Sequence, residues 1–109
     1  LLMSSVLGMA PSSSYFATHA YAAAKAAIVG LTRSSASYYA PHNIRFNALA
    51  PAVVDTPMAR RAMADSGIQQ FLATKQPLDG GRAGRADDLD AAAVYFLSDA
   101  SRFVHGPLL

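Results

Sequence analysis

Cysteine and tryptophan are absent from this 109-residue sequence, and charged residues make up only 15% of it. Without cysteine, the chain can form neither a disulfide scaffold nor a cysteine-ligated metal site. The same absence fits a reducing compartment, so we expect a cytoplasmic location. The net charge of +2 is too small, and the basic residues are too scattered, to indicate a nucleic-acid partner. No apolar run reaches the length of a membrane-spanning helix, so we expect no membrane partner.

The remaining candidates for metal ligands and anion sites are dispersed along the chain. Its histidines are His19, His42 and His105, and we predict no metal site from so wide a spacing. Arg82 and Arg85 stand in a polar stretch, and we interpret them as solvated surface or as a local contact with an anion.

Hydrophobic residues make up 52% of the chain, which is typical of a globular sequence that forms a core. The length suits one small domain, and we expect residues 1–109 to form a single partial domain. The chain begins inside an apolar run at Leu1 and ends on Leu109 without a polar tail. We therefore expect it to be part of a longer protein.

Local patterns predict short buried strands that alternate with longer helices, the order of an α/β protein with a parallel sheet. Strands are expected at residues 1–6, 43–50 and 107–109, and helices at residues 17–39, 58–64, 68–74 and 87–97. Ser66 and Gly67 separate the two short helices, and Asp55 or Thr56 followed by Pro57 is typical of a helix start. The glycine-rich stretch 80–84 does not follow a strand, so we interpret it as a connection and not as a phosphate-binding loop.

Tyr21 and Lys25 lie four residues apart within the longest predicted helix. This spacing places both side chains on one face of a helix, one turn apart. An ammonium group beside a phenol favours the phenolate, and such a phenol can exchange a proton with an alcohol or a ketone at neutral pH. The spacing also arises by chance, so an ordinary amphipathic helix with a solvated lysine is the alternative interpretation.

Further motifs surround this pair in a definite order. Ser4, Ser5 and Val6 end the first predicted strand, and residues 47–56 (NALAPAVVDT) leave the second. Residues 81–89 (GRAGRADDL), residues 92–99 (AAVYFLSD) and Gly106 come later. Together these motifs resemble the C-terminal half of the short-chain dehydrogenase/reductase family over essentially the whole chain, and they are similar to members of the 3-oxoacyl-carrier-protein reductase type.

The resemblance implies the C-terminal part of a Rossmann-type, doubly wound parallel sheet in a three-layer αβα arrangement. The N-terminal half of that fold, which carries the dinucleotide fingerprint, lies outside this sequence. The family uses the tyrosine of its YxxxK motif as general acid/base, which assigns that role to Tyr21. Lys25 would favour the ionised tyrosine and would hydrogen-bond the ribose of a nicotinamide cofactor.

A serine at the end of the preceding strand orients and polarises the substrate oxygen in this family. Ser5 matches that position best, so the resemblance makes it the third catalytic residue. The gap between Ser5 and Tyr21 is longer than the family's usual one. The alternatives for the serine are therefore Ser4, Ser13 and Ser14.

Residues 51–56 resemble the family's PGxxxT segment, which encloses the nicotinamide end of NAD or NADP. The resemblance assigns cofactor binding to Tyr21, Lys25, Pro51, Ala52, Val54 and Thr56. The backbone of Val54 would meet the carboxamide, and the Thr56 hydroxyl would add a hydrogen bond, although Thr56 also suits a helix cap. Ala52 replaces the usual glycine, which is tolerable only if this position does not need a positive φ.

The resemblance predicts an oxidoreductase that transfers hydride between NAD(P)(H) and a small carbonyl/alcohol substrate. It also predicts a homodimer or homotetramer formed through the helix at residues 17–39. The alternative is an inactive fragment or a binding module without its own dinucleotide site. A serine hydrolase built on Ser5 is a third class, but the G-x-S-x-G elbow is missing. We expect Asn47 to be structural and His19 to line the site or to lie on the surface.

Overall fold

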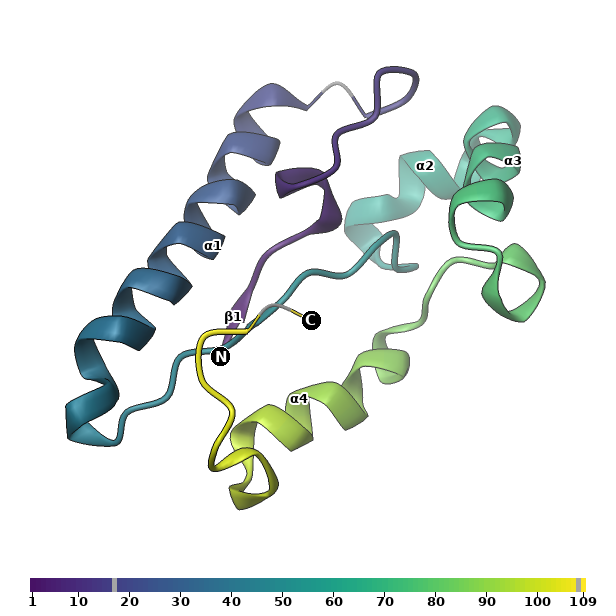
Figure 1. The fold of residues 1–109 in the computed structure, drawn as a ribbon. Helices are drawn as coiled ribbons and strands as arrows, with labels where there is room; N and C mark the ends of the chain where they lie inside the picture. Colours follow the sequence, from purple (N-terminus) through teal and green to yellow (C-terminus); the bar gives the residue numbers. More distant parts are fainter. Residues whose placement is uncertain (17, 108) are drawn as a thin grey trace. The chain divides into compact units, whose positions relative to one another are not determined.

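The computed structural model describes residues 1–16, 18–107 and 109. The chain forms two compact units: Leu1–Pro51 with Ala91–Leu109 is the first, and Ala52–Asp90 is the second. The expected single domain stays a prediction. Figure 1 shows the course of the chain through its helices and strands.

The first unit contains a small parallel sheet of β1 (Leu2–Met3) and β2 (Ala48–Leu49). Leu2 pairs with Ala48 and Met3 with Leu49. Backbone hydrogen bonds continue the pairing to residue 6, where the chain turns into a 3-10 helix, Val6–Gly8. Both strands are present where they were predicted but are shorter. Before β2, the backbone of Phe46 bonds to His105 and Gly106 and not to β1.

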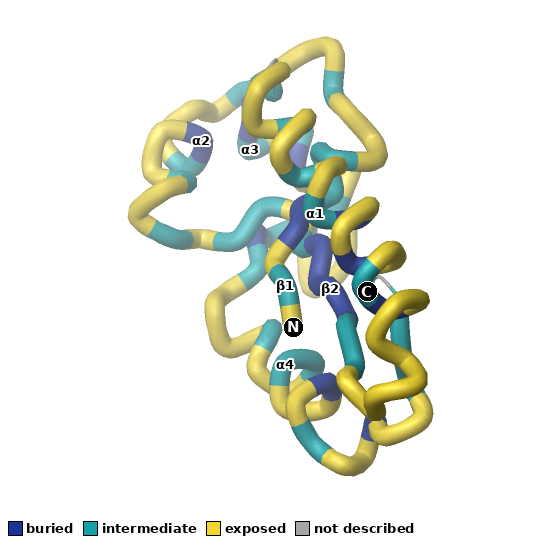
Figure 2. Tube along the Cα trace, turned by 90° about the vertical axis from the view of Figure 1, so that its left-hand side faces the viewer, coloured by how far each residue is buried: buried dark blue, intermediate teal, exposed yellow. Residues whose placement is uncertain are grey.

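The end of the chain also bonds to β2. The N–H of Ala48 donates to the carbonyl of Pro107, and the N–H of Leu109 donates to the carbonyl of Ala48, which is the pattern of a parallel pair. Leu108, in the middle of the predicted third strand, lies outside the described residues. Figure 2 shows β2 as a buried segment, in agreement with the burial of residues 47–50.

Helix α1 (His19–Tyr39) confirms the long helix predicted at residues 17–39, of which Ala17 lies outside the described part. Its alanine-rich composition favours the helix. Val29, Thr32 and Ala36 are buried at a spacing of three and four residues, so one stripe of the helix faces the unit's core. Figure 1 shows α1 running beside β1, with which it is in contact.

Helix α4 (Asp90–Leu97) follows a 3-10 turn, Ala86–Leu89, so the helix predicted at residues 87–97 is present in two parts. The guanidinium of Arg45 donates to the carbonyls of Phe96, Ser98 and Ser101 at 3.1, 3.2 and 3.0 Å. These acceptors include the carbonyls that a helix leaves unpaired at its C-terminus. Arg45 therefore joins the end of α4 to the residues that precede β2.

The second unit contains α2 (Arg60–Ala64) and α3 (Ser66–Lys75), after a 3-10 turn at Pro57–Ala59. The predicted break at Ser66 and Gly67 is wrong, because both residues lie inside α3. The break is at Asp65, whose carboxylate accepts the N–H of Ile68 at 3.0 Å and so caps α3.

The stretch that joins α3 to α4 is a connection, as predicted, and its turn is tight. Asp79, Gly80 and Gly81 have φ values of 52°, 76° and 78°. Arg82 follows, and its guanidinium pairs with Asp79 and with both carboxylate oxygens of Asp88 at the surface.

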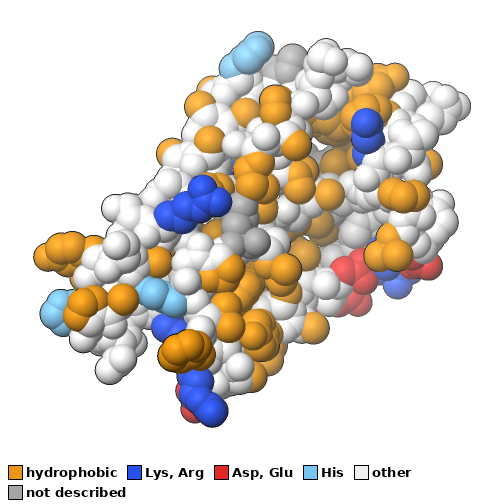
Figure 3. Space-filling model, viewed as in Figure 1, with side chains coloured by type: hydrophobic (Ala, Val, Ile, Leu, Met, Phe, Trp, Pro, Cys, Tyr) orange, Lys and Arg blue, Asp and Glu red, His pale blue; other side chains and the backbone are white. Residues whose placement is uncertain are grey.

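Apolar side chains cover much of the surface shown in Figure 3. In the first unit the exposed ones include Leu31 on α1, Leu97 at the end of α4 and Phe103. Among residues 1–16, 18–107 and 109, no helix is both long enough and apolar enough to span a membrane.

Candidate active site

Tyr21 and Lys25 lie on one face of α1, as their spacing predicts. The Nζ atom of Lys25 is 5.5 Å from the centroid of the Tyr21 ring. The Tyr21 residue is 37% exposed, so part of its side chain is accessible to a small molecule. The pair thus combines an accessible phenol with a positive charge one helical turn away.

Lys25 is attached to the end of β1 by its side chain and by its backbone. Its ammonium group donates to the carbonyl of Met3 at 2.9 Å, and its own carbonyl accepts the hydroxyl of Ser4 at 2.7 Å. An ammonium group has three donors. Because Met3 is its one hydrogen-bond partner in the described part of the chain, two donors of Lys25 are left for a ligand.

Gly8 allows this close approach of strand and helix. A Cβ atom at Gly8 would lie 2.8 Å from the backbone nitrogen of Ala26 and 2.8 Å from the carbonyl carbon of Lys25. No real Cβ atom tolerates such distances to backbone, so the turn at Val6–Gly8 can lie against α1 only with glycine there. Gly8 thereby sets the separation between the strand end and the turn of α1 that carries Lys25.

Ser5 caps the Val6–Gly8 turn, and its Oγ accepts the N–H of Leu7 at 3.2 Å. This bond uses a lone pair of the hydroxyl, and among residues 1–16, 18–107 and 109 the hydroxyl proton of Ser5 has no acceptor, so it can be donated to a ligand. The hydroxyl proton of Ser4 is already donated to the carbonyl of Lys25. Of these two serines, Ser5 is therefore better suited to polarise a substrate oxygen.

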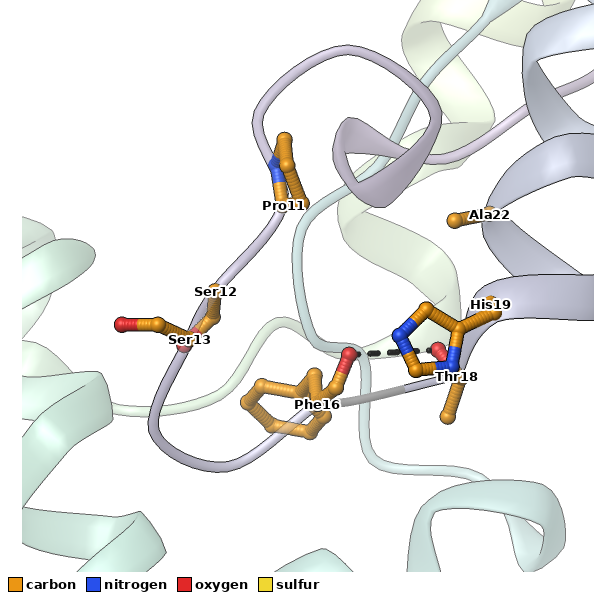
Figure 4. Close-up of a pocket in the computed structure, with 7 residues that line it drawn as sticks. All are labelled: Pro11, Ser12, Ser13, Phe16, Thr18, His19 and Ala22. Atoms are coloured by element: carbon orange, nitrogen blue, oxygen red, sulfur yellow. Dashed lines mark hydrogen bonds between the residues drawn. The ribbon is translucent and has the colours of Figure 1, made fainter.

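A hollow of about 410 Å³ opens at the N-terminal end of α1 (Figure 4). It is lined by Pro11, Ser12, Ser13, Phe16, Thr18, His19 and Ala22. His19 and Ala22 belong to α1 and flank Tyr21 in the sequence, so the hollow lies at the end of the helix that carries the phenol. Its volume is within the range of small-molecule sites. His19 lines this hollow, and its expected place at the active site or on the surface stays a prediction.

In the second unit, the loop after Pro51 is held by an isolated parallel bridge between Val54 and Gly84. The N–H of Gly84 donates to the carbonyl of Val53 at 2.9 Å, and the N–H of Asp55 donates to the carbonyl of Gly84 at 2.7 Å. Within the described chain, the N–H and the C=O of Val54 itself bond to no other residue. They are therefore available to a ligand.

Ala52 does not strain this loop. Among the described non-glycine residues, only Asn43 and Asp79 have a positive φ. Ala52 is also exposed, so its methyl group is not confined within the unit. Alanine at position 52 is therefore compatible with the conformation of this loop.

Thr56 stands at the N-cap position of the Pro57–Ala59 turn, but its side chain makes no capping hydrogen bond. Its position at a helix start agrees with the prediction, whereas the bond that a cap would form is missing. Thr56 lines a second hollow of about 260 Å³ together with Asp55, Pro57, Arg60 and Met63. Its hydroxyl makes no hydrogen bond to any residue that the structure describes, and we infer that it can bind a ligand there.

Asn47 is structural, as predicted. Its side chain is buried, donates to the carbonyl of Val104 at 3.1 Å and accepts the N–H of Gly106 at 3.2 Å. His105 has a similar role, which the sequence did not indicate: its Nδ1 accepts the N–H of Phe46 at 3.1 Å. Both residues join β2 to the loop that follows α4.

Asp88 is the titratable group with the clearest electrostatic perturbation near the Val54 loop. The hydrogen bonds from Arg82, followed by the backbone N–H of Arg85, lower the pKa of Asp88 from 3.8 to about 2. The ion pair is exposed and lies beside Gly84, the bridge partner of Val54. In the part of the chain that the structure describes, no group of three or more His, Asp or Glu side chains is arranged to hold a metal ion.

Residues 1–109 match the family model described as Enoyl-(Acyl carrier protein) reductase. A structure of a short-chain type dehydrogenase/reductase from Mycobacterium ulcerans superposes on 98% of the chain with a TM-score of 0.85 and 25% identity. This chain belongs to the short-chain dehydrogenase/reductase family. The likeness also confirms the predicted fold, the C-terminal part of a Rossmann-type parallel sheet.

Other relatives agree with this family. The chain is 47% identical over 90 residues, or 82% of its length, to 2,5-dichloro-2,5-cyclohexadiene-1,4-diol dehydrogenase of Sphingobium indicum. A structure of a gluconate 5-dehydrogenase from Burkholderia cenocepacia in complex with NADP and tartrate superposes on 99% of this chain, with a TM-score of 0.84 and 31% identity. The chain spans 35%, 38% and 41% of the Sphingobium, Mycobacterium and Burkholderia proteins.

Proposed function

We propose that this short-chain dehydrogenase/reductase transfers hydride between NAD(P)(H) and a small-molecule carbonyl/alcohol substrate. The observation that carries the proposal is the position of Lys25. Its ammonium group lies 5.5 Å from the Tyr21 ring centroid and is bonded to the end of the strand that leads into Ser5. A proton-transfer group, a positive charge and a neutral hydrogen-bond donor are thus carried by one helix and one strand end.

Each of the three residues has one role in this reaction. During reduction, Tyr21 donates its phenolic proton to the substrate oxygen while the carbonyl carbon receives hydride, and during oxidation it takes the proton back. Lys25 stabilises the phenolate that remains. Ser5 donates its free hydroxyl proton in a hydrogen bond to the same oxygen, where negative charge develops. The bound nicotinamide supplies or accepts the hydride.

The cofactor residues in this proposal are Tyr21, Lys25, Pro51, Ala52, Val54 and Thr56. A carboxamide has both donors and an acceptor, which complement the unpaired C=O and N–H of Val54. In the second unit, the hydroxyl of Thr56 suits a further polar group of such a ligand; in the first unit, the remaining donors of Lys25 suit the hydroxyls of a ribose. The related gluconate 5-dehydrogenase contains NADP, and we propose NAD or NADP for this protein.

The other two function classes are less well supported. A serine hydrolase needs a base at its nucleophile, and no histidine hydrogen-bonds Ser5 among the described residues. An inactive fragment or binding module would have the same fold, but it would not need a tyrosine and a lysine one turn apart on α1 together with a serine at the end of β1.

We also propose a homodimer or homotetramer, formed through the outer face of α1. Ala23, Ala27 and Gly30 are exposed on this helix, and small residues allow a second helix to approach closely. Sedimentation of the full-length protein tests this assembly, and a strictly monomeric protein would contradict it. The cytoplasmic location stays a prediction.

The function is tested by turnover of the full-length protein with NAD and NADP. The alcohol panel should contain cyclic diols and sugar acids, the substrate types in the names of the two relatives above, with the corresponding ketones for the reverse reaction. We expect substrate-dependent formation of reduced cofactor, followed by its absorbance. Saturable cofactor binding without turnover of any panel member would favour the binding module instead.

A further inference from the structure

Gln76 is the first residue after α3, and its half-buried side chain reaches the loop that contains Val53 and Val54. Its Oε1 accepts the N–H of Val53 at 3.0 Å, and its Nε2 donates to the carbonyl of Val53 at 3.2 Å. The same Nε2 donates to the carbonyl of Arg82 at 3.3 Å. One primary amide thus binds both backbone polar groups of Val53 and links them to the neighbouring segment.

These bonds act together with the Val54–Gly84 bridge. The carbonyl of Val53 accepts from Gln76 and from the N–H of Gly84, and the N–H of Asp55 donates to the carbonyl of Gly84. The residues on both sides of Val54 are therefore fixed by hydrogen bonds. Each peptide group is planar, so the carbonyl of Val53 lies in one plane with the N–H of Val54, and the N–H of Asp55 lies in one plane with the carbonyl of Val54. Hydrogen bonds that fix the Val53 carbonyl and the Asp55 N–H therefore also fix the directions of the N–H and C=O of Val54.

We propose that Gln76 is a positioning residue for the nicotinamide cofactor, an inference that rests on the proposed function. Its amide holds the Val53 backbone so that the unpaired N–H and C=O of Val54 keep one orientation for binding the carboxamide. Gln76 would not touch the cofactor itself. Without it, the loop has to be ordered at the moment of binding, which lowers the affinity.

Glutamine is chemically required for this arrangement. Its amide supplies an acceptor and two donors at once, whereas a carboxylate of the same shape only accepts hydrogen bonds. Gln76→Glu would therefore place negative charge beside the carbonyls of Val53 and Arg82, with no donor for either. Gln76→Leu keeps most of the volume and removes all three bonds. The exposed Gln70 on α3, whose side chain makes no hydrogen bond to any described residue, offers a control in Gln70→Leu.

The test compares two ligands of the full-length protein: NADH or NADPH, whichever it binds, and the corresponding ADP-ribose, which lacks the nicotinamide ring. We expect Gln76→Leu and Gln76→Glu to raise the Kd of the reduced cofactor about tenfold or more. The Kd of the ADP-ribose should change less than twofold, and Gln70→Leu should leave both values unchanged. The KM for the cofactor should rise in both Gln76 variants, with a smaller effect on kcat.

Three outcomes would overturn the positioning role: unchanged cofactor binding in both Gln76 variants, equal weakening of both ligands, or loss of the folded state in both variants. The last two would make Gln76 a structural residue only. Failure of the wild-type protein to bind either ligand or to turn over any substrate is a separate result, because it contradicts the proposed function.

Discussion

Two neighbouring serines at the end of β1 differ in the use of their hydroxyl protons. Both serines are buried, but Ser4 donates to the carbonyl of Lys25, whereas Ser5 accepts from Leu7 and donates its proton to no described residue. The motif alone ranked Ser5 first and left Ser4 as an alternative, since two adjacent hydroxyls look alike in a sequence. The hydrogen bonds distinguish them.

The two serines should therefore respond differently to replacement by alanine in the full-length protein. Ser5→Ala should lower kcat about 10²- to 10³-fold, because a donor at the developing negative charge is lost. Ser4→Ala should instead lower the free energy of unfolding by about 1 kcal/mol, with a smaller loss of kcat. Steady-state kinetics and denaturant titration of both variants check this. A larger kcat loss in Ser4→Ala would assign the catalytic role to Ser4.

Asp88 should make the stability of the protein sensitive to acid. Arg82 lowers the pKa of Asp88 in the folded state from 3.8 to about 2, so its stabilising effect is complete above about pH 4 and is lost as the pH falls towards 2. The difference in unfolding free energy between wild type and Asp88→Asn should shrink over that range. Denaturant titrations at several pH values measure it, with Asp87→Asn as control. A difference that stays constant between pH 5 and pH 2 would contradict the assignment.

Residue-level prediction from the sequence succeeded where the function depends on local spacing. Tyr21 and Lys25 are close because a helix brings residues four apart together, whatever surrounds it. Gln76 and Arg45 act on backbone groups that lie 23 and more than 50 residues away along the chain. No local pattern contains such contacts, so the sequence did not indicate either residue.

At the scale of elements, α1 and the end of β1 are held together by the backbone contact at Gly8 and by the bonds of Ser4 and Lys25. The helix was predicted almost to the residue, because alanine content and Pro41 define it locally. The strands were predicted too long, because their ends depend on which loop pairs with them. The break before α3 was predicted at Ser66 and Gly67, two residues that often interrupt helices. It lies at Asp65, because the carboxylate of Asp65 caps α3 and the helix then begins at Ser66.

A methyl group at Gly8 should separate these two elements. Gly8→Ala places a Cβ atom 2.8 Å from helix backbone, and overpacking of this kind costs about 1–3 kcal/mol. Ser66→Ala is the control: Ser66 is an exposed residue of α3, outside both elements, and its replacement should change the stability by less than about 0.5 kcal/mol. Thermal unfolding of the two variants of the full-length protein gives the comparison. A Gly8→Ala protein as stable as wild type would show that the turn does not need this close approach.

At the scale of the whole molecule, the described chain leaves much apolar surface uncovered. Phe103 is fully exposed, and Leu97, Val94 and Leu31 are more than half exposed. Parallel sheets are normally covered on both faces, and an unpaired edge invites aggregation. The chain also spans only 35% to 41% of the three relatives compared with it.

The isolated 109-residue polypeptide should therefore be poorly folded or aggregate, and it should not bind NAD(P)H measurably. Calorimetry and cofactor titration of the purified polypeptide test this expectation. A cooperative thermal transition together with saturable binding of NADH or NADPH would refute it, and would show that these residues suffice for the cofactor site.

The central claim is that Tyr21 exchanges the proton in a hydride-transfer reaction. The measurement that tests it most directly is the turnover of Tyr21→Phe in the full-length protein, with the dissociation constant of the cofactor measured in parallel. Loss of a general acid/base should lower kcat about 10²- to 10⁴-fold, while the Kd of the cofactor stays nearly unchanged because Lys25 and the Val54 loop are intact. A Tyr21→Phe protein that keeps most of the wild-type turnover would contradict the account.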